Sequence, residues 1–344
     1  MIYIGLGRSV SYNSFSKKNI GVSLLSALIA FLLSAILMQS IDDQKSRNDL
    51  KHYQAHYNCL TLSISSIASC QPVLGKPIDI LYQSFAYVMK FFYGNSGFYL
   101  FSFSFSFLVY FTVLYFSSVV VRFSLIPFLF LLSDFRFYEL GSNVLRNGMA
   151  VSLTIIIFYF KGGTVLRLIP ILAHLSTIPF LVARYVNINR MGYLFLLVSA
   201  FFLSEFVYFI LVFLMEYSSP ALAGKIYAYT TSMDYSKTLP PLQYVGVLFL
   251  CLYFYPILRK DYWFFSSFNV FFTFTLFAIV FQPFGIGYRF FNFVTPFAAI
   301  SLSLVISYVA RAYGKFAFIF LVLFMILAFL LIFWKNYEAI FRNF

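Results

Sequence analysis

The chain has 344 residues, of which 62% are hydrophobic and only 10% are charged, and its formal net charge is +13. A soluble globular domain carries about a quarter charged residues, so this composition excludes a water-soluble protein and leaves lipid as most of the solvent. The basic residues separate the apolar runs, a pattern set by orientation in a membrane and not by nucleic acid. We therefore expect an all-α, polytopic integral membrane protein, with a single membrane domain over residues 1–344 and no nucleic-acid partner.

Six uncharged runs are long enough to cross the hydrocarbon core as helices, for which about 20 residues are needed. They are residues 20–41, 91–121, 238–258, 262–288, 290–310 and 316–334. The second run contains the alternating sequence Phe101-Ser-Phe-Ser-Phe-Ser-Phe107, which suggests a strand, but its place inside a long uncharged run favours a helix. With the shorter apolar segments included, we expect about 8–11 transmembrane segments, one or two of them partial or re-entrant.

The charges around the first run predict the orientation. Three basic residues and no acidic one precede this run, which places the N-terminus in the cytoplasm. Polar loops at residues 42–77 and 215–241 then lie on the outer, periplasmic side. Residues 78–93 form a short apolar segment, which is either a marginal span or an interfacial helix on the outer face.

A second short apolar segment, residues 168–183, is broken by the sequence His174-Leu-Ser-Thr-Ile-Pro179. Pro170 and Pro179 disfavour an unbroken helix. If the segment enters the membrane and returns, the basic residues on both of its flanks stay on the cytoplasmic side. We therefore favour a re-entrant segment over a full span.

Ionisable residues at membrane depth are costly, so each is a candidate for function. They are Asp134, Arg136, Glu139, Arg146, His174, Glu205 and Arg289. Arg146 and Arg289 open predicted spans at their outer ends, and they either snorkel as anchors or bind an anion such as phosphate. His174 is the only histidine within an apolar segment, and it is either a buried hydrogen-bonding residue or a general base.

The first outer loop carries a predicted helical stripe. Asp49, Tyr53 and Tyr57 lie at positions i, i+4 and i+8, on one helix face. This is either an ordinary amphipathic face or a sugar-binding stripe, in which aromatic rings stack on pyranose rings and the carboxylate accepts hydroxyl hydrogen bonds. His52 and His56 are also i, i+4, and we interpret them as a solvated face, because a zinc site needs more ligands. No metal is expected.

The chain has three cysteines. Cys59 and Cys70 lie in the first outer loop, and a periplasmic loop faces an oxidising compartment, so we expect these two to form a disulfide. Cys251 lies within a predicted span and should be a buried free thiol.

These residues resemble the bacterial O-antigen and exopolysaccharide polymerases of the Wzy and EpsG-like type, over roughly residues 20–310. The stripe of Asp49, Tyr53 and Tyr57 follows the first span, as in that family. The stretch from Leu145-Arg146-Asn147-Gly148 through Lys161 to Ala173-His174-Leu-Ser176 is similar to the family's Arg-Gln…Ala…Lys-Lys…Phe-His-x-Ser block, with Asn147 in place of Gln and Ala173 in place of the aromatic residue. The sequence Tyr288-Arg289-Phe-Phe-Asn292 is similar to its late arginine-containing turn.

The resemblance implies a multi-pass glycosyltransferase of the bacterial inner membrane that uses no metal and no other cofactor. Such polymerases transfer a growing glycan from undecaprenyl pyrophosphate to a lipid-linked repeat unit at the periplasmic face, in the synthesis of lipopolysaccharide O-antigen or exopolysaccharide. The implied partners are the undecaprenyl-pyrophosphate-linked oligosaccharide and the lipid bilayer, with a chain-length regulator protein as a further candidate.

The resemblance also suggests a role for each candidate residue. A cationic clamp on the pyrophosphate leaving group suits Arg146 and Arg289. A base for the attacking hydroxyl suits His174, with Asp134 or Glu139 as alternatives. The residues expected to bind the sugars are Asp49, Tyr53, Tyr57, Asp134 and Glu139.

Two other functions stay open at this point. A lipid-linked oligosaccharide flippase or transporter would use the same buried charges for alternating access, although such transporters commonly have two related halves and none is evident here. An O-antigen ligase, which transfers the finished chain to a lipid A core, is hardly separable from a polymerase by sequence.

Overall fold

The computed structural model describes residues 15–40, 48–70, 80–95, 97–121, 125–142, 144–217, 241–282 and 287–341. Every regular element within these ranges is a helix, which confirms the predicted all-α class for this part of the chain. The first elements are α1 (Phe15–Ser40), α2 (Asn48–Cys59), α3 (Ser65–Ser69), α5 (Ile80–Tyr93), α6 (Phe98–Val119), α7 (Leu125–Ser133), α8 (Phe135–Ser142) and α9 (Leu145–Tyr159). They are followed by η2 (Leu166–Leu172), η3 (Leu175–Thr177), α10 (Ile178–Ala183), α11 (Arg190–Tyr217), α13 (Leu242–Leu258), α14 (Tyr262–Val280), α15 (Gly287–Ala312) and α16 (Gly314–Phe341).

The six uncharged runs of the sequence form α1, α6, α13, α14, α15 and α16. In the described part of the chain, α1, α6, α11, α14 and α15 are long and apolar enough to cross a membrane. Helices α8 and α9, which meet at 109°, make a sixth span if they act as one broken helix. This is fewer than the 8–11 segments predicted, because other apolar stretches form shorter helices, such as α7 with 9 residues and α13 with 17.

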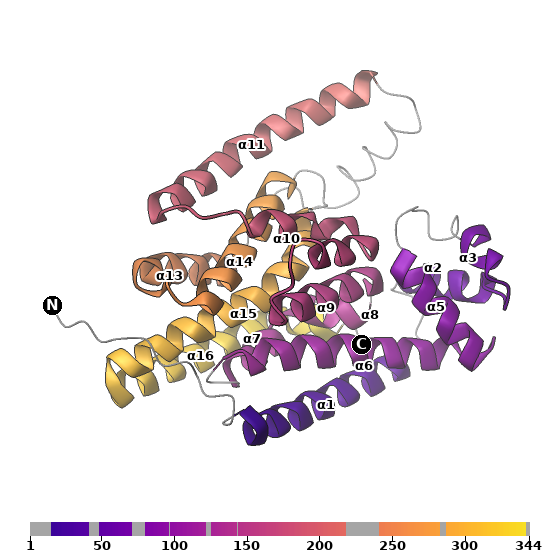
Figure 1. Cartoon of the computed structure of the whole chain (residues 1–344), viewed down its shortest axis with the longest axis horizontal. Helices are drawn as coiled ribbons and strands as arrows, with labels where there is room; N and C mark the ends of the chain where they lie inside the picture. Colours follow the sequence, from indigo (N-terminus) through magenta and orange to yellow (C-terminus); the bar gives the residue numbers. More distant parts are fainter. Residues whose placement is uncertain are drawn as a thin grey trace.

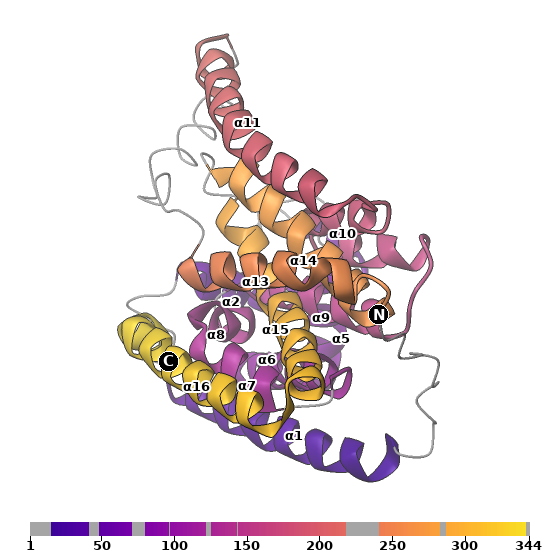
Figure 2. The ribbon, with the colours of Figure 1, turned by 90° about the vertical axis from the view of Figure 1, so that its left-hand side faces the viewer.

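Helix α11 exposes apolar side chains along most of its length. Phe195, Phe202 and Phe209 are 71%, 74% and 68% exposed. Figure 2 shows α11 standing apart from the other helices, and its main packing partner is α14. Apolar exposure on this scale is unfavourable in water but not in hydrocarbon. With the other long apolar helices, it indicates a multi-pass membrane protein.

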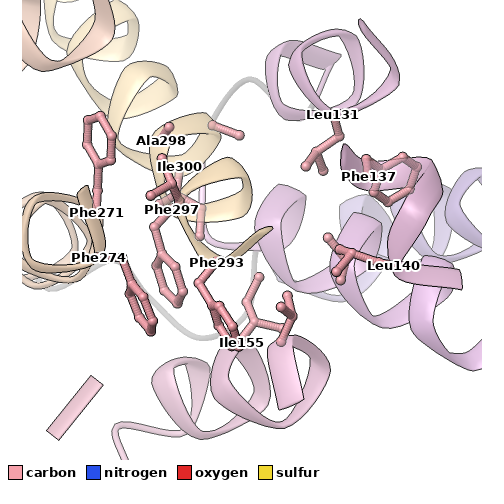
Figure 3. Packing of buried hydrophobic residues seen from close by; sticks show 14 of the residues in the cluster. Leu131, Phe137, Leu140, Ile155, Phe271, Phe274, Phe293, Phe297, Ala298 and Ile300 are labelled. Carbon is pink, nitrogen blue, oxygen red and sulfur yellow. The ribbon is translucent and has the colours of Figure 1, made fainter. Parts of the chain in front are cut away.

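The packed centre of the bundle lies between α14 and α15, with α9 and the α7–α8 pair around them (Figure 3). The rings of Phe274 and Phe293 stack with centroids 4.7 Å apart, and Phe158 of α9 meets Phe297 edge to face at 5.1 Å. Lipid chains are as apolar as these rings, so close van der Waals packing, and not transfer out of water, holds these helices together.

Helix α6 confirms the helical interpretation of residues 101–107, and α1 lies along it (Figure 1). Its buried Ser106 hydroxyl donates to the Gly141 carbonyl, and the Tyr110 hydroxyl donates to the Tyr138 carbonyl at 2.6 Å. The Gly141 carbonyl is one of the last four of α8, which have no partner within the helix, and the Tyr138 carbonyl also accepts from the Ser142 hydroxyl at 2.9 Å. The hydrogen bonds of Ser106 and Tyr110 therefore attach α6 to α8, just before α9 begins.

Helices α2, α3 and α5 form a cap at one end of the bundle, at the right of Figure 1. The predicted disulfide between Cys59 and Cys70 is present in the cap, and Cys251 is a buried free thiol, as expected. Helix α5 has only 14 residues, and its Lys90 ammonium donates to the Tyr57 carbonyl at 3.0 Å. Of the two readings of residues 78–93, this packing favours an interfacial helix. The predicted loop at 215–241 lies almost entirely outside the described residues.

The bundle has two ends, named here after α9. At the Arg146 end, α9 and α15 begin next to the cap. At the Lys161 end, α9 has ended and α14 begins. The two helix ends are close together there, since the Lys161 ammonium lies 4.5 Å from the ring centroid of Tyr262. Helix α9 has 15 residues, so the two ends are about 22 Å apart along it.

Residues 164–184 form a hairpin that leaves the Lys161 end and returns to it. Its two arms are joined at the base, where Arg184 Nη1 donates to Thr164 Oγ1 at 2.7 Å and Arg167 Nη1 donates to the Phe180 carbonyl at 3.2 Å. Its tip reaches the first turn of α9, where Ser176 Oγ donates to Asn147 Oδ1 at 3.1 Å. The segment predicted to return therefore does return within the fold.

Cysteines introduced at Gly163 and Asn187, on either side of the hairpin, should react from the same side of the membrane, because a hairpin returns the chain to its starting side. Both positions are exposed, and a side chain at Gly163 would meet no atom within 4 Å. A membrane-impermeant maleimide on intact cells should label neither, and permeabilised cells should label both. A cysteine at the exposed Lys51 of the cap is the matched control and should react in intact cells. Labelling of only one of the pair in intact cells would mean that the segment crosses.

Candidate functional site

A narrow cleft at the Arg146 end brings together four of the predicted site residues. It is lined by Tyr53, Val144, Arg146, Asn147, His174 and Arg289, which come from α2, the start of α9, the tip of the hairpin and the start of α15. Its volume is about 10 Å³, enough for roughly one water molecule. A larger ligand must displace the long side chains of Arg146 or Arg289, both only half-buried.

Two glycines allow the arginine-bearing helices to begin here. A Cβ on Gly148 would collide with the carbonyl of Leu140 in α8, and a Cβ on Gly287 would collide with the carbonyl of Ala278 and the backbone of Gln282. Glycine is the only residue that tolerates such close backbone approach. The close approach of α9 to α8 at Gly148 and of α15 to α14 at Gly287 therefore helps to place Arg146 and Arg289 at one cleft.

The hydrogen bonds of His174 define where its proton lies. The backbone N–H of Ser176 donates to His174 Nδ1 at 3.1 Å, and the Ser176 hydroxyl lies 2.6 Å from the same nitrogen. Because Nδ1 accepts a hydrogen bond, the neutral imidazole carries its proton on Nε2. His174 therefore has Nε2–H as a hydrogen-bond donor. Because Nε2 already carries a proton in this tautomer, it cannot act as a general base.

Asn147 completes this arrangement. Its Oδ1 accepts from the Ser176 hydroxyl, and its Nδ2 is buried without a hydrogen-bond partner among the described residues. Asn147 is not among the site residues predicted from the sequence, because no local pattern indicates its contact with Ser176. The cleft therefore combines two guanidinium groups, an amide donor and an imidazole N–H, which suits an oxyanion.

Tyr53 and Tyr57 have different environments although both lie on α2. Tyr53 lines the cleft, and the Arg146 guanidinium lies 5.8 Å from its ring centroid. Tyr57 is fully buried, with the Lys90 ammonium 4.7 Å from its ring and Phe101 5.3 Å away on centroids. No face of Tyr57 is open to a sugar ring, so the predicted stacking role does not fit its position. The side chain of Asp49 lies outside the described residues.

The interpretation of His56 as part of a solvated face is wrong. His52 is exposed, but His56 is fully buried, and neither of its ring nitrogens has a hydrogen-bond partner among the described residues. Burial, with a smaller contribution from the positive charge of Arg146, lowers the pKa of His56 to about 4. His56 is therefore neutral near pH 7. The helical period of α2 does not distinguish these two histidines, because both positions share one side of the helix.

Asp134 lies at the break between α7 and α8 and is completely buried. Its Oδ1 accepts the backbone N–H of Arg136 at 3.1 Å and lies 3.6 Å from Nη1 of the same residue. Its Oδ2 accepts from the hydroxyl of Tyr244 and from Thr295 Oγ1, the latter at 3.1 Å. Through these hydrogen bonds Asp134 connects the α7–α8 break to α13 and α15. Its carboxylate is therefore inaccessible to a substrate.

Arg136 and Glu139 connect this buried network to the cleft. The Arg136 guanidinium lies 4.6 to 5.5 Å from four aromatic ring centroids, of which Tyr288 is one, at 5.1 Å. The Tyr288 hydroxyl donates to Glu139 Oε2 at 2.7 Å. Tyr288 immediately precedes Arg289, so these contacts set the position of Arg289. Glu139 is only half-buried, unlike Asp134.

Comparison with models of known families, with characterised proteins and with solved structures gives no match for this chain.

Asp134→Ala should strongly destabilise the protein, because it leaves the Arg136 guanidinium buried without its carboxylate. Breaking a buried ion pair on one side costs about 3–5 kcal/mol. Tyr244→Phe removes one donor and leaves Thr295 in place, so it should cost about 1–2 kcal/mol. Both can be ranked by thermal unfolding of detergent-purified protein. Glu205→Ala, at an exposed carboxylate on α11, is the control and should change little. An Asp134→Ala variant as stable as this control would exclude the structural role.

Proposed function

We propose that the chain is a polysaccharide polymerase of the bacterial inner membrane, which transfers a growing O-antigen or exopolysaccharide chain from undecaprenyl pyrophosphate to a lipid-linked repeat unit. One observation carries the proposal. Arg146, Arg289 and His174 come from three separate segments, lie in the stretches that resemble the motifs of the polymerase family, and converge on one cleft. Residues that serve as independent membrane anchors have no reason to meet at one point.

The distribution of charge supports a periplasmic cleft. The Lys161 end carries most of the basic residues that flank the helices, namely Lys161, Arg167, Arg184, Arg190, Arg259, Lys260 and Arg311. An acidic residue, Asp261, also lies at this end, as the N-cap of α14. An excess of lysine and arginine favours the cytoplasmic side, so the Arg146 end faces the periplasm.

The reaction requires that the bond between the sugar and the pyrophosphate oxygen breaks while the acceptor hydroxyl bonds to the same sugar carbon. The pyrophosphate leaves with increased negative charge. Arg146 and Arg289 would stabilise that charge, since a guanidinium binds phosphate oxygens through two parallel hydrogen bonds. His174 Nε2–H and Asn147 Nδ2–H would donate to the same oxygens.

The proton of the acceptor hydroxyl needs a different recipient, because His174 Nδ1 already accepts a hydrogen bond. Of the carboxylates considered from the sequence, Asp134 is fully buried and multiply hydrogen-bonded. Glu139 is half-buried and bonded to Tyr288, one residue before Arg289. We therefore assign Glu139 as the base in this proposal and His174 as a donor to the leaving group.

Arg146→Lys and Arg289→Lys should each reduce polymer formation about ten-fold or more, because lysine keeps the charge but loses the paired hydrogen bonds. The measurement is gel analysis of surface polysaccharide in a deletion strain carrying each variant, with membrane abundance scored in parallel. Arg311→Lys at the other end is the matched control and should support full-length polymer.

The banding pattern separates the alternatives. Single repeat units capped on the lipid core identify a polymerase defect. Loss of all capping would instead assign the protein as a ligase or flippase. Full-length polymer from both variants at wild-type abundance would show that Arg146 and Arg289 are anchors.

His174→Gln should retain more activity than His174→Ala, because the glutamine side-chain amide places an N–H near the position of His174 Nε2. A general base could not be replaced in this way, since an amide does not accept a proton near neutral pH. Polymer length at matched protein level is the measurement. An equal loss of polymer in both variants would indicate that His174 is a base. Polymer of wild-type length in both variants would indicate a structural role.

A further inference from the structure

A second cluster of cations surrounds a cavity at the Lys161 end, outside the cleft described above. The cavity has a volume of about 200 Å³, and its lining includes Lys161, Arg167, Arg184 and Tyr262. It lies between the base of the hairpin and the start of α14. It is much larger than the cleft at the Arg146 end, and three positive side chains line it.

None of these three cations forms an ion pair with an acidic residue in the described part of the chain. Arg184 donates to the hydroxyl of Thr164, and Arg167 donates to the carbonyls of Gly162 and Phe180. Asp261 immediately precedes the cavity residue Tyr262 in the chain. Its carboxylate accepts a hydrogen bond from the backbone N–H of Phe264 at 3.0 Å and so caps α14. Neutral partners do not offset the mutual repulsion of three positive charges.

Arg167 does not behave as an interfacial anchor. An anchor arginine extends its charged group into the aqueous interface, but Arg167 is only 6% exposed. Burial and the neighbouring charge of Arg184 lower the pKa of Arg167. A buried guanidinium without a carboxylate is costly unless an anion compensates it.

Lys161 lies at the C-terminal end of α9 and lines the cavity. Its φ is +54°, a left-handed value at which a residue with a side chain is disfavoured by about 1 kcal/mol or more, although two glycines follow immediately. Its ammonium lies 4.5 Å from the ring of Tyr262 and 5.2 Å from that of Trp263. The left-handed backbone ends α9, where the Gly162 N–H donates to the Ile157 carbonyl at 2.8 Å, and the two ring contacts place the ammonium beside the cavity.

We propose that this cavity binds a phosphate group, carried by either an anionic phospholipid headgroup or free phosphate, through Lys161, Arg167 and Arg184. Two guanidinium groups and an ammonium on one wall match the charge and the oxygen geometry of phosphate. Basic cavities between membrane helices on the cytoplasmic side are places where acidic headgroups bind. The site is separate from the cleft at the other end of α9 and stands whether or not the chain is a polymerase.

Trp263 supplies a fluorescent reporter beside the cavity. The chain has two tryptophans, and the other, Trp334, is exposed on α16, so Trp334→Phe leaves Trp263 as the only indole. The purified full chain with this substitution is titrated in neutral detergent with inorganic phosphate, and separately with phosphatidylglycerol or phosphatidylcholine in mixed micelles. Native mass spectrometry of the same preparations detects phospholipid that is retained through purification.

The variants are Arg184→Gln and Lys161→Asn, since asparagine tolerates the left-handed backbone. The control is Lys260→Gln, an exposed basic residue at the same end and outside the cavity lining. Either variant should weaken the response to phosphate or phosphatidylglycerol about ten-fold or more, as expected for loss of a charge-assisted hydrogen bond, and the control should not.

The outcomes assign the source of the phosphate. A saturable response to inorganic phosphate assigns a free anion. A response to phosphatidylglycerol alone, or a retained acidic phospholipid that Arg184→Gln releases, assigns a lipid headgroup. The proposal is overturned if neither probe gives a response and no phospholipid is retained. It is equally overturned if the two variants and the Lys260→Gln control bind alike.

Discussion

A chain that bends inside a membrane exposes backbone N–H and C=O groups that hydrocarbon cannot solvate, so the protein must supply their partners. The described part of this chain bends in this way between α7 and α9 and again in the hairpin. At the first bend Asp134 accepts the N–H of Arg136, and at the hairpin tip His174 accepts the N–H of Ser176. The Ser176–Asn147 hydrogen bond then joins the two bends. Of these polar side chains, His174 and Asn147 also line the cleft.

The environments of three arginines show how partners determine what a buried cation does. Arg136 is enclosed by aromatic rings and faces the Asp134 carboxylate, so its charge is compensated within the protein. Arg146 lines the cleft, half-buried, with its guanidinium 5.8 Å from the ring centroid of Tyr53. Arg167 is as buried as Arg136, but its partners in the described part of the chain are two carbonyls and the ring of Phe180, 4.5 Å away, with no carboxylate among them. A compensated cation stabilises the fold, whereas a cation beside a cavity and without a carboxylate is suited to a ligand.

The sequence predicts those features that depend on local composition. Uncharged runs predict the long helices, the basic flanks of residues 168–183 predict the hairpin, and the motifs select Arg146 and Arg289. Burial on the short cap helix could not be predicted, because α2 is covered by α5 and α6, which follow it in the chain. Partners brought together by tertiary packing, such as Tyr244 with Asp134 across 110 residues, leave no local signal. The number of spans is also lower than predicted, because apolar stretches such as α7 and α13 form helices too short to cross a membrane.

The positions of protons near Arg146 limit the chemistry available in the cleft. His56 is neutral because burial and the positive field of Arg146 both oppose its protonation, but it is completely enclosed and cannot reach a substrate. His174 reaches the cleft, yet its Nδ1 is occupied by Ser176, so the nitrogen it presents bears hydrogen. Neither histidine is therefore placed to take a proton from a ligand in the cleft. A base at this site has to be a carboxylate or the ligand's own phosphate oxygen, and the protein contributes mainly by holding positive charge and donors where negative charge develops.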